Sequence, residues 1–210
     1  MAQLDGTQQG TAQRDLSGLE LVEITTATWQ VFEELFGPGG VQGGCWCSWF
    51  RLSSRDYSSS SSAERRDFVH ARVEAGEPFG LVARLDGEPL GWVSVAPRQC
   101  HPRLERSVVA RLAEDEDPAS LWTVACFYIK REARGVGLSH RLLDAAVEHA
   151  ASRGARAVEG YPVDTAGGKT PAQDLYYGTL EVFLAAGFEL VEGRRDGAPI
   201  EAGTAAANGG

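Results

Sequence analysis

The sequence reads Leu121-Trp-Thr-Val-Ala-Cys-Phe-Tyr-Ile129 and then, without interruption, Lys130-Arg-Glu-Ala-Arg134-Gly135-Val136-Gly137-Leu138-Ser139. The first stretch has apolar and β-branched residues on both faces, which is typical of a strand at the centre of a sheet that is covered on both sides. After Ser139, leucines and alanines recur at helical spacing as far as Arg153, and Gly154 ends the pattern. A buried strand, a turn rich in Arg and Gly, and an amphipathic helix therefore follow one another.

The turn between this strand and this helix has the composition of an anion-binding site. The first turn of a helix presents unpaired N–H groups and the positive end of the helix dipole, and glycines let an anion approach the backbone closely. Arg131, Arg134 and Arg141 would add positive charge there. We therefore interpret the turn as a phosphate cradle. The alternative for the three arginines is an ordinary solvated basic face.

Two segments of the sequence resemble nucleotide-binding motifs without matching them. In the dinucleotide fingerprint that Gly135-Val136-Gly137 begins, the third glycine would fall at His140, and the preceding strand would have to open a βαβ unit. Gly167-Gly-Lys-Thr170 resembles the end of a Walker A loop, but Val163 stands in place of its first glycine and Pro171 follows at once. A P-loop nucleotide hydrolase is therefore a minor alternative, and this segment is expected to form a loop.

Outward from this unit, hydrophobic periodicity predicts further strands and helices. We expect strands over residues 19–24, 79–84, 89–95, 155–163 and 188–191, with a weak partner over 198–201, and helices over 26–36, 62–76 and 176–186. Asp86-Gly87 accepts the positive φ of a tight hairpin turn between two of these strands. The run from Ser58 to Ser62 is expected to be a loop. The order of elements indicates a mixed α/β fold.

Length and composition indicate one soluble domain. The 210 residues suit a single domain, and 43% apolar with 23% charged residues falls in the globular range. Polar, aperiodic ends predict tails over 1–18 and 203–210, around a domain over 19–202. The formal net charge of −9 argues against a surface that is basic throughout, as a nucleic-acid-binding protein would need.

Targeting and redox signals indicate a cytoplasmic protein. The longest apolar run, Leu121 to Ile129, is too short to span a bilayer, and the first residues lack the pattern of a signal peptide. The four cysteines, Cys45, Cys47, Cys100 and Cys126, are too few and too scattered for a secreted disulfide framework. We expect reduced thiols, no membrane partner and no nucleic-acid partner. The Cys-x-Cys spacing is tighter than usual for zinc, so no metal is expected.

The residues of the turn resemble those of a known family. Arg134-x-x-Gly137-x-Ser139, followed by Leu142-Leu143 and an alanine-rich helix, resembles the acetyl-CoA signature Gln/Arg-x-x-Gly-x-Gly/Ala of the GNAT superfamily of N-acetyltransferases. Ala186-Gly187-Phe188, after the last helix, is similar to the family as well. Ser139 stands where Gly or Ala is usual, and its small side chain leaves the amide accessible.

The resemblance implies a mixed, mostly antiparallel sheet of six to seven strands, with helices on both faces and a splay between strands 4 and 5, the strands at 121–129 and 155–163. It implies acetyl-CoA as co-substrate, with pantetheine paired against the splayed strand and the diphosphate held by the turn. It also allows a homodimer. The residues expected to bind the co-substrate are Phe127, Tyr128, Ile129, Arg134, Gly135, Val136, Gly137, Leu138 and Ser139.

Attack of an amine on the thioester needs a base, because an alkylamine is mostly protonated near neutral pH. Glu159, an ionisable residue within an otherwise apolar strand, is the candidate; the alternatives are a carboxylate on the solvated rim of the sheet or a partner of Arg156. Phe183 lies where many family members carry a tyrosine that protonates the departing thiolate. Tyr176 or Tyr177 is expected to take that role, unless the thiolate leaves without a dedicated acid.

Together, the resemblance and the residues predict an N-acetyltransferase that moves an acetyl group from acetyl-CoA to the primary amine of a small molecule in a ternary complex. The alternative is a non-catalytic acyl-CoA-binding or regulatory domain, which Phe183 favours. The acceptor is not specified by the sequence, although the negative net charge of the chain mildly favours cationic acceptors.

Overall fold

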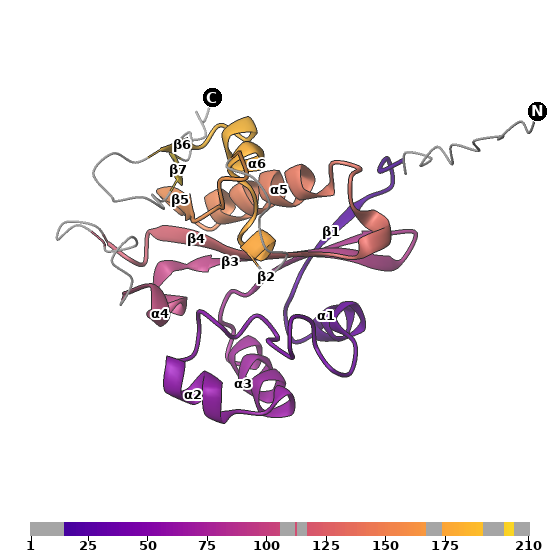
Figure 1. Ribbon diagram of the computed structural model, residues 1–210, viewed down its shortest axis with the longest axis vertical. Helices are drawn as coiled ribbons and strands as arrows, with labels where there is room; N and C mark the ends of the chain where they lie inside the picture. Colours follow the sequence, from indigo (N-terminus) through magenta and orange to yellow (C-terminus); the bar gives the residue numbers. More distant parts are fainter. Residues whose placement is uncertain (1–14, 106–111, 113–116, 167–173, 191–199, 204–210) are drawn as a thin grey trace, which may run out of the picture.

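The computed structural model describes residues 15–105, 112, 117–166, 174–190 and 200–203. Within them, one sheet of seven strands runs in the order β1-β2-β3-β4-β5-β7-β6 (Figure 1). All neighbours pair antiparallel except β4 and β5, which are parallel. The strands are β1 (Glu20–Glu23), β2 (Gly80–Leu85), β3 (Glu88–Pro97), β4 (Leu121–Ile129), β5 (Ala157–Gly160), β6 (Glu189–Leu190) and β7 (Ile200–Gly203).

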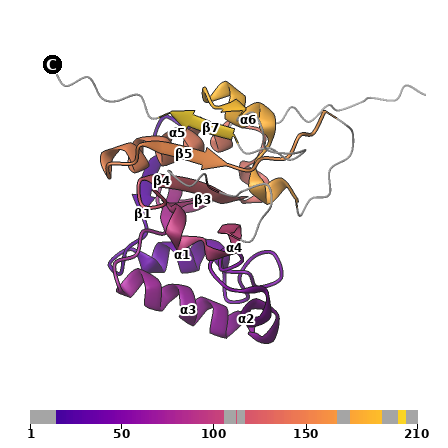
Figure 2. The ribbon, with the colours of Figure 1, turned by 90° about the vertical axis from the view of Figure 1, so that its left-hand side faces the viewer.

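Helices cover both faces of the sheet (Figures 1 and 2). One face carries α1 (Trp29–Phe36), α2 (Ser54–Ser59), α3 (Ser62–Glu74) and α4 (Pro102–Glu105), and the other carries α5 (Leu138–Ser152) and α6 (Leu180–Ala185). The described residues also include the short 3-10 helices η1 (Arg98–Cys100), η2 (Arg131–Ala133) and η3 (Asp174–Tyr177). The predicted fold class, a mostly antiparallel mixed sheet between helices, is confirmed.

The sheet separates two apolar cores because successive strand residues point to opposite faces. Leu81 and Val93 pack under α5 with its buried stripe, whereas Val82 and Trp92 pack on the other side with the aromatic residues of α1. The buried stripe of α5 consists of Leu138, Leu142, Leu143, Ala146 and Ala150. The prediction of a sheet covered on both faces, made from a strand that is apolar on both faces, is therefore confirmed.

The partners of β4 change along its length, and this change opens the sheet. Parallel pairing with β5 runs from Leu121↔Ala157 to Val124↔Gly160, whereas β4 continues to Ile129. On its other edge, the register with β3 shifts so that Ala125 is an extra residue, a β-bulge. Bulges re-aim strands and are common next to active sites. The predicted splay between strands 4 and 5 therefore begins at the bulge.

Several predicted elements have different limits. The helix expected over 176–186 begins only at Leu180, because Gly178 has a φ of +80° that ends η3 and breaks the helical path. Tyr176 and Tyr177 are thus on η3 and not in the first turn of a helix. The strand expected over 155–163 is confined to β5, followed by an isolated bridge from Val163 to Thr179.

The serine run is largely helical and not a loop. Ser58 and Ser59 end α2, and Ser61 caps α3 by a capping box with Glu64, in which each side chain meets the other's backbone N–H. Gly203, expected in the C-terminal tail, is the last residue of β7. Residues 1–14 and 204–210 of the expected tails, and Gly167 to Thr170, lie outside the described residues.

Candidate active site

The turn that links β4 to α5 is held by two glycines in the left-handed region. Gly135 has a φ of +73° and Gly137, the residue before α5, a φ of +82°. An L side chain is strained at such angles, so glycine allows the chain to reverse directly into the helix. Gly137 has no side chain that could cap α5, and the first N–H groups of a helix have no intrahelical acceptor. Exposed backbone donors therefore gather at the start of α5.

A cavity of about 500 Å³ lies against this turn, and we call it the turn cavity. Eight of the nine residues predicted to bind the co-substrate line it: Phe127, Tyr128, Ile129, Arg134, Gly135, Gly137, Leu138 and Ser139. The ninth, Val136, is half-buried and packs against the core beneath α5. Residues of η3 and α6, among them Tyr176 and Val182, close the opposite wall.

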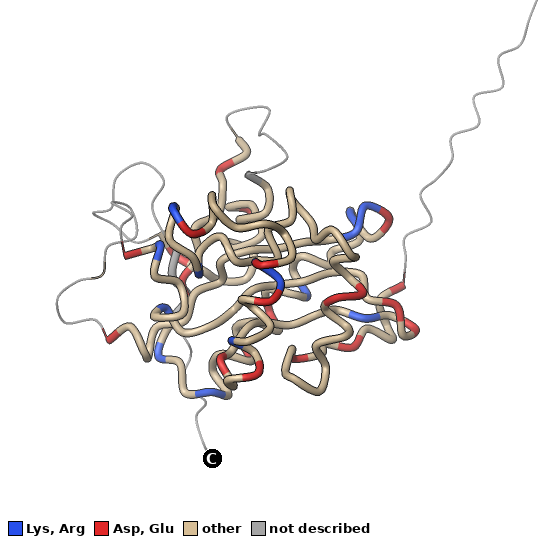
Figure 3. The backbone as a smooth tube through the Cα atoms, turned by 90° about the horizontal axis from the view of Figure 1, so that it is seen from below, with Lys and Arg blue, Asp and Glu red and all other residues tan. Residues whose placement is uncertain are grey.

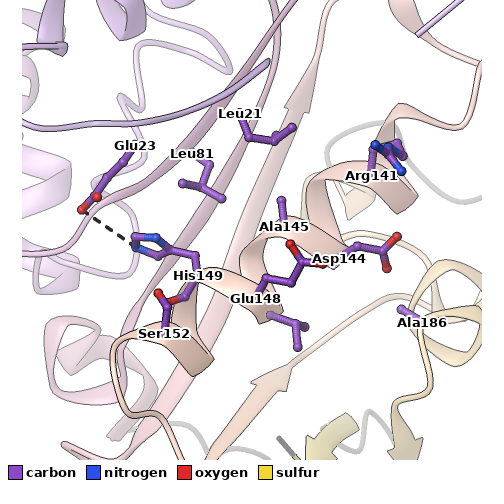
Figure 4. A pocket seen from close by; sticks show the side chains of 11 residues that line it. Leu21, Glu23, Leu81, Arg141, Asp144, Ala145, Glu148, His149, Ser152 and Ala186 are labelled. Carbon is purple, nitrogen blue, oxygen red and sulfur yellow. Dashed lines mark hydrogen bonds and ion pairs between the residues drawn. The ribbon is translucent and has the colours of Figure 1, made fainter. Parts of the chain in front are cut away.

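Of the three arginines near the turn, Arg134 alone lines the turn cavity. Its Nε donates to the carbonyl of Ile129 at 3.0 Å, which fixes the guanidinium at the end of β4. Arg131 is exposed on η2. Arg141 lines a different cavity, on the face of α5 towards β1 and β2 (Figure 4). The sequence-based grouping of all three arginines around one anion is therefore wrong for Arg141.

A second cavity, of about 340 Å³, adjoins the first, and we call it the aromatic cavity. Its lining residues are Val41, Gln42, Cys45, Cys47, Trp49, Phe50, Tyr57, Ser94, His101, Ala125, Cys126, Tyr176 and Tyr177. Along β4, Ala125 and Cys126 line the aromatic cavity, and the next three residues line the turn cavity. Tyr176 lines both cavities. The two cavities therefore meet where β4 has separated from β5.

The two tyrosines of η3 differ in position. Tyr176 lies where the cavities meet, whereas Tyr177 lines the aromatic cavity only and contacts Phe50 edge-on, with 5.8 Å between ring centroids. Burial raises the pKa of Tyr176, and the positive charge of Arg134 partly offsets that effect. The phenol of Tyr176 is therefore protonated near neutral pH and available as a hydrogen-bond donor.

Glu159 lies outside the lining of both cavities, within a buried polar cluster. Its carboxylate forms an ion pair with Arg98 and accepts hydrogen bonds from Thr123 at 2.7 Å and Tyr161 at 2.8 Å. Arg98 belongs to η1, 61 residues earlier in the chain, so its role had no signal in the sequence. Glu159 is thus neither on a solvated rim nor gathered with Tyr176 and Tyr177 around the cavities.

Phe183 is fully buried at the junction of the sheet and α6. Its ring contacts Phe127 and Phe188 edge-on, with centroid distances of 6.1 and 4.9 Å. A Cβ at Gly178 would lie 2.8 Å from this ring. The position where family members carry a tyrosine is therefore occupied by an apolar side chain packed into the core.

Sequence reasoning considered His101 only as a zinc ligand, a role it set aside, whereas in the structure His101 lines the aromatic cavity and is 1% exposed. Neither ring nitrogen makes a hydrogen bond of normal geometry within the described residues, although a weaker contact with the backbone of Pro97 favours the protonated ring. Burial lowers the pKa of His101 well below its usual value, and the charges of Arg51 and Arg98 act in the same direction. His101 is therefore neutral near pH 7. Only the fold brings it to the cavity, because it follows η1 in a segment without periodicity.

Two cysteines of the cavity, Cys45 and Cys47, are not activated thiolates. Burial raises the pKa of Cys45, and that of Cys47 well above its usual value. A nucleophilic or metal-binding cysteine needs the opposite shift. Within the described residues, no group of three or more His, Cys, Asp or Glu side chains is arranged to hold a metal ion.

A third cavity, of about 690 Å³, lies between α5 and the strands β1 and β2 (Figure 4). His149 and Glu23 face one another across it at 3.9 Å, and Arg153 pairs with the same carboxylate at 2.6 Å. The carboxylate of Glu23 thus interacts with two basic side chains at this cavity. No residue of the turn or of η3 lines this third cavity. We therefore do not include it in the candidate active site, despite its volume.

The charged residues of the described chain are interleaved. Figure 3 shows acidic and basic positions mixed along the backbone, with more of the acidic ones on the right-hand side of that view. None of the helices in the described ranges has the length and apolar character needed to cross a bilayer.

The family model described as the acetyltransferase (GNAT) family matches residues 46–178, which include β2 to β5, the turn and η3. This match covers more than half of the chain, so the chain belongs to the acetyltransferase (GNAT) family. No curated protein sequence matches the chain.

Solved structures agree with this assignment at the level of the fold. An N-acetyltransferase from Staphylococcus aureus Mu50 is 13% identical, with a TM-score of 0.50 and 90% of this chain aligned to 99% of that one. The aminoglycoside acetyltransferase AAC(6')-Ib in complex with coenzyme A is 16% identical, with a TM-score of 0.53 and coverage of 90% and 96%. The same enzyme with ribostamycin and coenzyme A also has a TM-score of 0.53, at 16% identity with coverage of 90% and 96%.

Proposed function

We propose that this protein transfers an acetyl group from acetyl-CoA to the primary amine of a small molecule by direct attack in a ternary complex. The observation that carries the proposal is the meeting of two cavities along one strand. The turn cavity has backbone donors and Arg134 at one end, the aromatic cavity continues along β4, and Tyr176 lies at their junction. Two substrates bound there would meet at the bulge of β4.

The turn cavity is the proposed place of acetyl-CoA. Amides of Gly135 to Ser139, aided by the guanidinium of Arg134, hold the diphosphate at the positive end of α5. Pantetheine pairs with the backbone of Phe127 to Ile129, where no strand of the described residues pairs with β4 on the side of β5. The coenzyme A bound in the structure of the aminoglycoside acetyltransferase is consistent with this co-substrate.

The chemistry requires a place for the charge on oxygen and a proton for sulfur. The amine attacks the carbonyl carbon of the thioester and loses a proton to water, a backbone N–H near Cys126 or Phe127 stabilises the oxyanion, and the C–S bond then breaks. Tyr176 gives the departing thiolate its proton, because its phenol is protonated and lies between the cavities. Tyr177, on the aromatic side only, contacts the acceptor. Glu159, paired with Arg98, positions β5 against β4 and does not act as the base.

A second candidate function is a non-catalytic acyl-CoA-binding domain. The burial of Phe183 favours it, because that position offers no hydroxyl group. The two candidates differ in one observable, namely the release of free coenzyme A from acetyl-CoA when amines are added. Amine-dependent thiol release supports the transferase, and tight binding of acetyl-CoA without any release across a panel of amines supports the binding domain.

Calorimetric titration with coenzyme A tests the place of the co-substrate. The double variant Arg134→Glu, Gly137→Asp should lose at least about tenfold in affinity, or about 1.4 kcal/mol, because a negative charge and a strained side chain then face the diphosphate. Arg141→Glu is the matched control, since it reverses a charge on the same helix at a residue that lines another cavity. Equal affinity for all three proteins contradicts the assignment.

A further inference from the structure

The aromatic cavity has an uncharged lining. Its residues within the described chain include five aromatic rings, three thiols and no Asp, Glu, Lys or Arg. The rings belong to Trp49, Phe50, Tyr57, Tyr176 and Tyr177. Burial raises the pKa of Tyr57 to about 12, so its phenol does not supply a negative charge. A cationic amine that entered this cavity would lose its hydration without meeting a carboxylate among these residues.

The charges behind the lining are positive on the side of His101. Arg51 and Arg98 both act on the imidazole, and their counter-ions Glu77 and Glu159 do not line the cavity. The same burial and the same charges that keep His101 neutral would act on any basic nitrogen placed beside it. An amine in this cavity is therefore held as its uncharged free base.

Aromatic rings can attract cations through their faces, but one face of the Trp49 ring is already occupied by an arginine side chain. The guanidinium of Arg103 lies 3.8 Å from the ring centroid of Trp49. Tyr57 contacts the ring of Trp49 edge-on at 4.8 Å. Cation–π attraction at the remaining faces is weaker than the cost of dehydrating an unpaired ammonium group. The rings are thus better suited to stacking on a flat apolar body.

His101 supplies the polar contact that such a body would need. It is buried and lines the cavity; neither ring nitrogen makes a hydrogen bond of normal geometry within the described residues, and the weaker backbone contact with Pro97 can engage only the N–H, which leaves the acceptor nitrogen open. A neutral imidazole has one N–H donor and one acceptor nitrogen. An unpaired acceptor in a buried cavity is costly unless a ligand satisfies it. The N–H of an aromatic amine matches this acceptor.

We propose that the acceptor is a weakly basic arylamine, bound as the free base in the aromatic cavity, and that the acceptor nitrogen of His101 receives the hydrogen bond from its amino group. This inference rests on the proposed acetyl transfer and specifies its acceptor. The arylamine nitrogen forms a bond to the acetyl carbon, and the bond from that carbon to sulfur breaks. His101 takes the proton from nitrogen and passes it to water, while sulfur receives the proton of Tyr176, which water restores. Aromatic amide and free coenzyme A are the products.

The first experiment compares two acceptors of one skeleton. p-Toluidine and trans-4-methylcyclohexylamine have the same heavy-atom connectivity, but the first is flat and weakly basic and the second is an ammonium ion at pH 7. We expect kcat/KM for thiol release to be at least tenfold higher for p-toluidine, and unchanged between pH 7 and 8.5. Higher kcat/KM for the cyclohexylamine, for spermidine or for ribostamycin overturns the inference while leaving acetyl transfer intact. No release with any amine, despite acetyl-CoA binding, contradicts the proposed function itself.

The second experiment tests the role of His101 and the effect of adding a carboxylate to the lining of the aromatic cavity. His101→Phe should lower kcat for p-toluidine at least tenfold while the affinity for coenzyme A is unchanged, and His101→Gln, whose amide oxygen can accept the N–H, should recover part of the loss. Gln42→Glu places a carboxylate in the lining at nearly constant shape. It should raise the ratio of kcat/KM for the cyclohexylamine to kcat/KM for p-toluidine several-fold. Equal rates for the parent protein and for both variants of His101 remove this residue from the mechanism.

Discussion

The ring of Phe183 occupies the space that a side chain at Gly160 would need. A Cβ on Gly160 would lie 2.7 Å from the Cζ of Phe183 and closer still to its Cε1, well inside the closest contact that carbon atoms make. Gly160 is the last residue of β5, paired with Val124 at the point where β4 continues without β5 as a neighbour. The splay of the sheet is therefore filled by an apolar ring from α6, and the absence of a side chain at Gly160 makes room for it.

We predict that Gly160→Ala destabilises the protein, because the ring of Phe183 is enclosed by Phe127 and Phe188 and cannot move away without strain. Overpacking of this kind costs about 1–3 kcal/mol of unfolding free energy, measured by urea denaturation. Gly39→Ala is the control, since Gly39 has open space and an ordinary φ. Phe183→Leu should partly restore the stability of Gly160→Ala. Equal denaturation midpoints for both alanine variants would show that the junction is loose.

The buried pair Arg98–Glu159 should be strongly coupled. Removing one partner leaves a buried charge unpaired, so Arg98→Met and Glu159→Gln are each expected to lower the unfolding free energy by about 3–5 kcal/mol. The double variant Arg98→Met, Glu159→Gln should lose less than the sum of the two, as a double-mutant cycle would reveal. Arg66→Ala, which breaks an exposed pair with Asp67, should leave stability nearly unchanged. Strict additivity would contradict the pairing.

His101 should make stability depend on pH in a defined direction. Its pKa is lowered in the folded protein, so below about pH 6.5 the unfolded chain binds a proton that the folded protein does not. The stabilising contribution is complete above that pH and falls as the solution is acidified. We expect His101→Gln to reduce the loss of unfolding free energy between pH 7 and pH 5. His149→Gln should act in the same direction but less, because His149 is only half-buried and Glu23 favours its charged form. An unchanged slope in both variants would refute the assignment.

Tyr176 and Tyr177 offer a matched pair for the departing thiolate. Tyr176→Phe removes a protonated phenol between the two cavities and should lower kcat by about 10²-fold, the usual scale of a general acid, with little change in coenzyme A affinity. Tyr177→Phe should affect KM for the acceptor more than kcat, because Tyr177 lines only the aromatic cavity. Steady-state thiol release at saturating acetyl-CoA measures both. If Tyr177→Phe lowers kcat more than Tyr176→Phe does, Tyr177 protonates the thiolate and Tyr176 contacts the acceptor.

Local patterns predicted much of the fold. The α5 stripe, the Asp86-Gly87 hairpin and the central strand all follow from spacing along neighbouring residues, and the turn follows from glycines that tolerate positive φ. The limits of η3 and α6 were missed because helical periodicity does not show a break at a single residue such as Gly178. The serine run was misassigned because capping depends on the pair Ser61 and Glu64 and not on composition.

The sequence by itself determined the family, the class of the sheet and the turn at Arg134 to Ser139, because the motifs that carry them consist of residues that are close in the chain. Only the tertiary structure decided that Glu159 pairs with Arg98, that Arg141 faces another cavity, and that His101 lines the aromatic cavity. The physical reason is that the ionisation and contacts of these groups depend on burial and on partners dozens of residues away. Such partners are brought together by the packing of the sheet against its helices, and no local pattern encodes them.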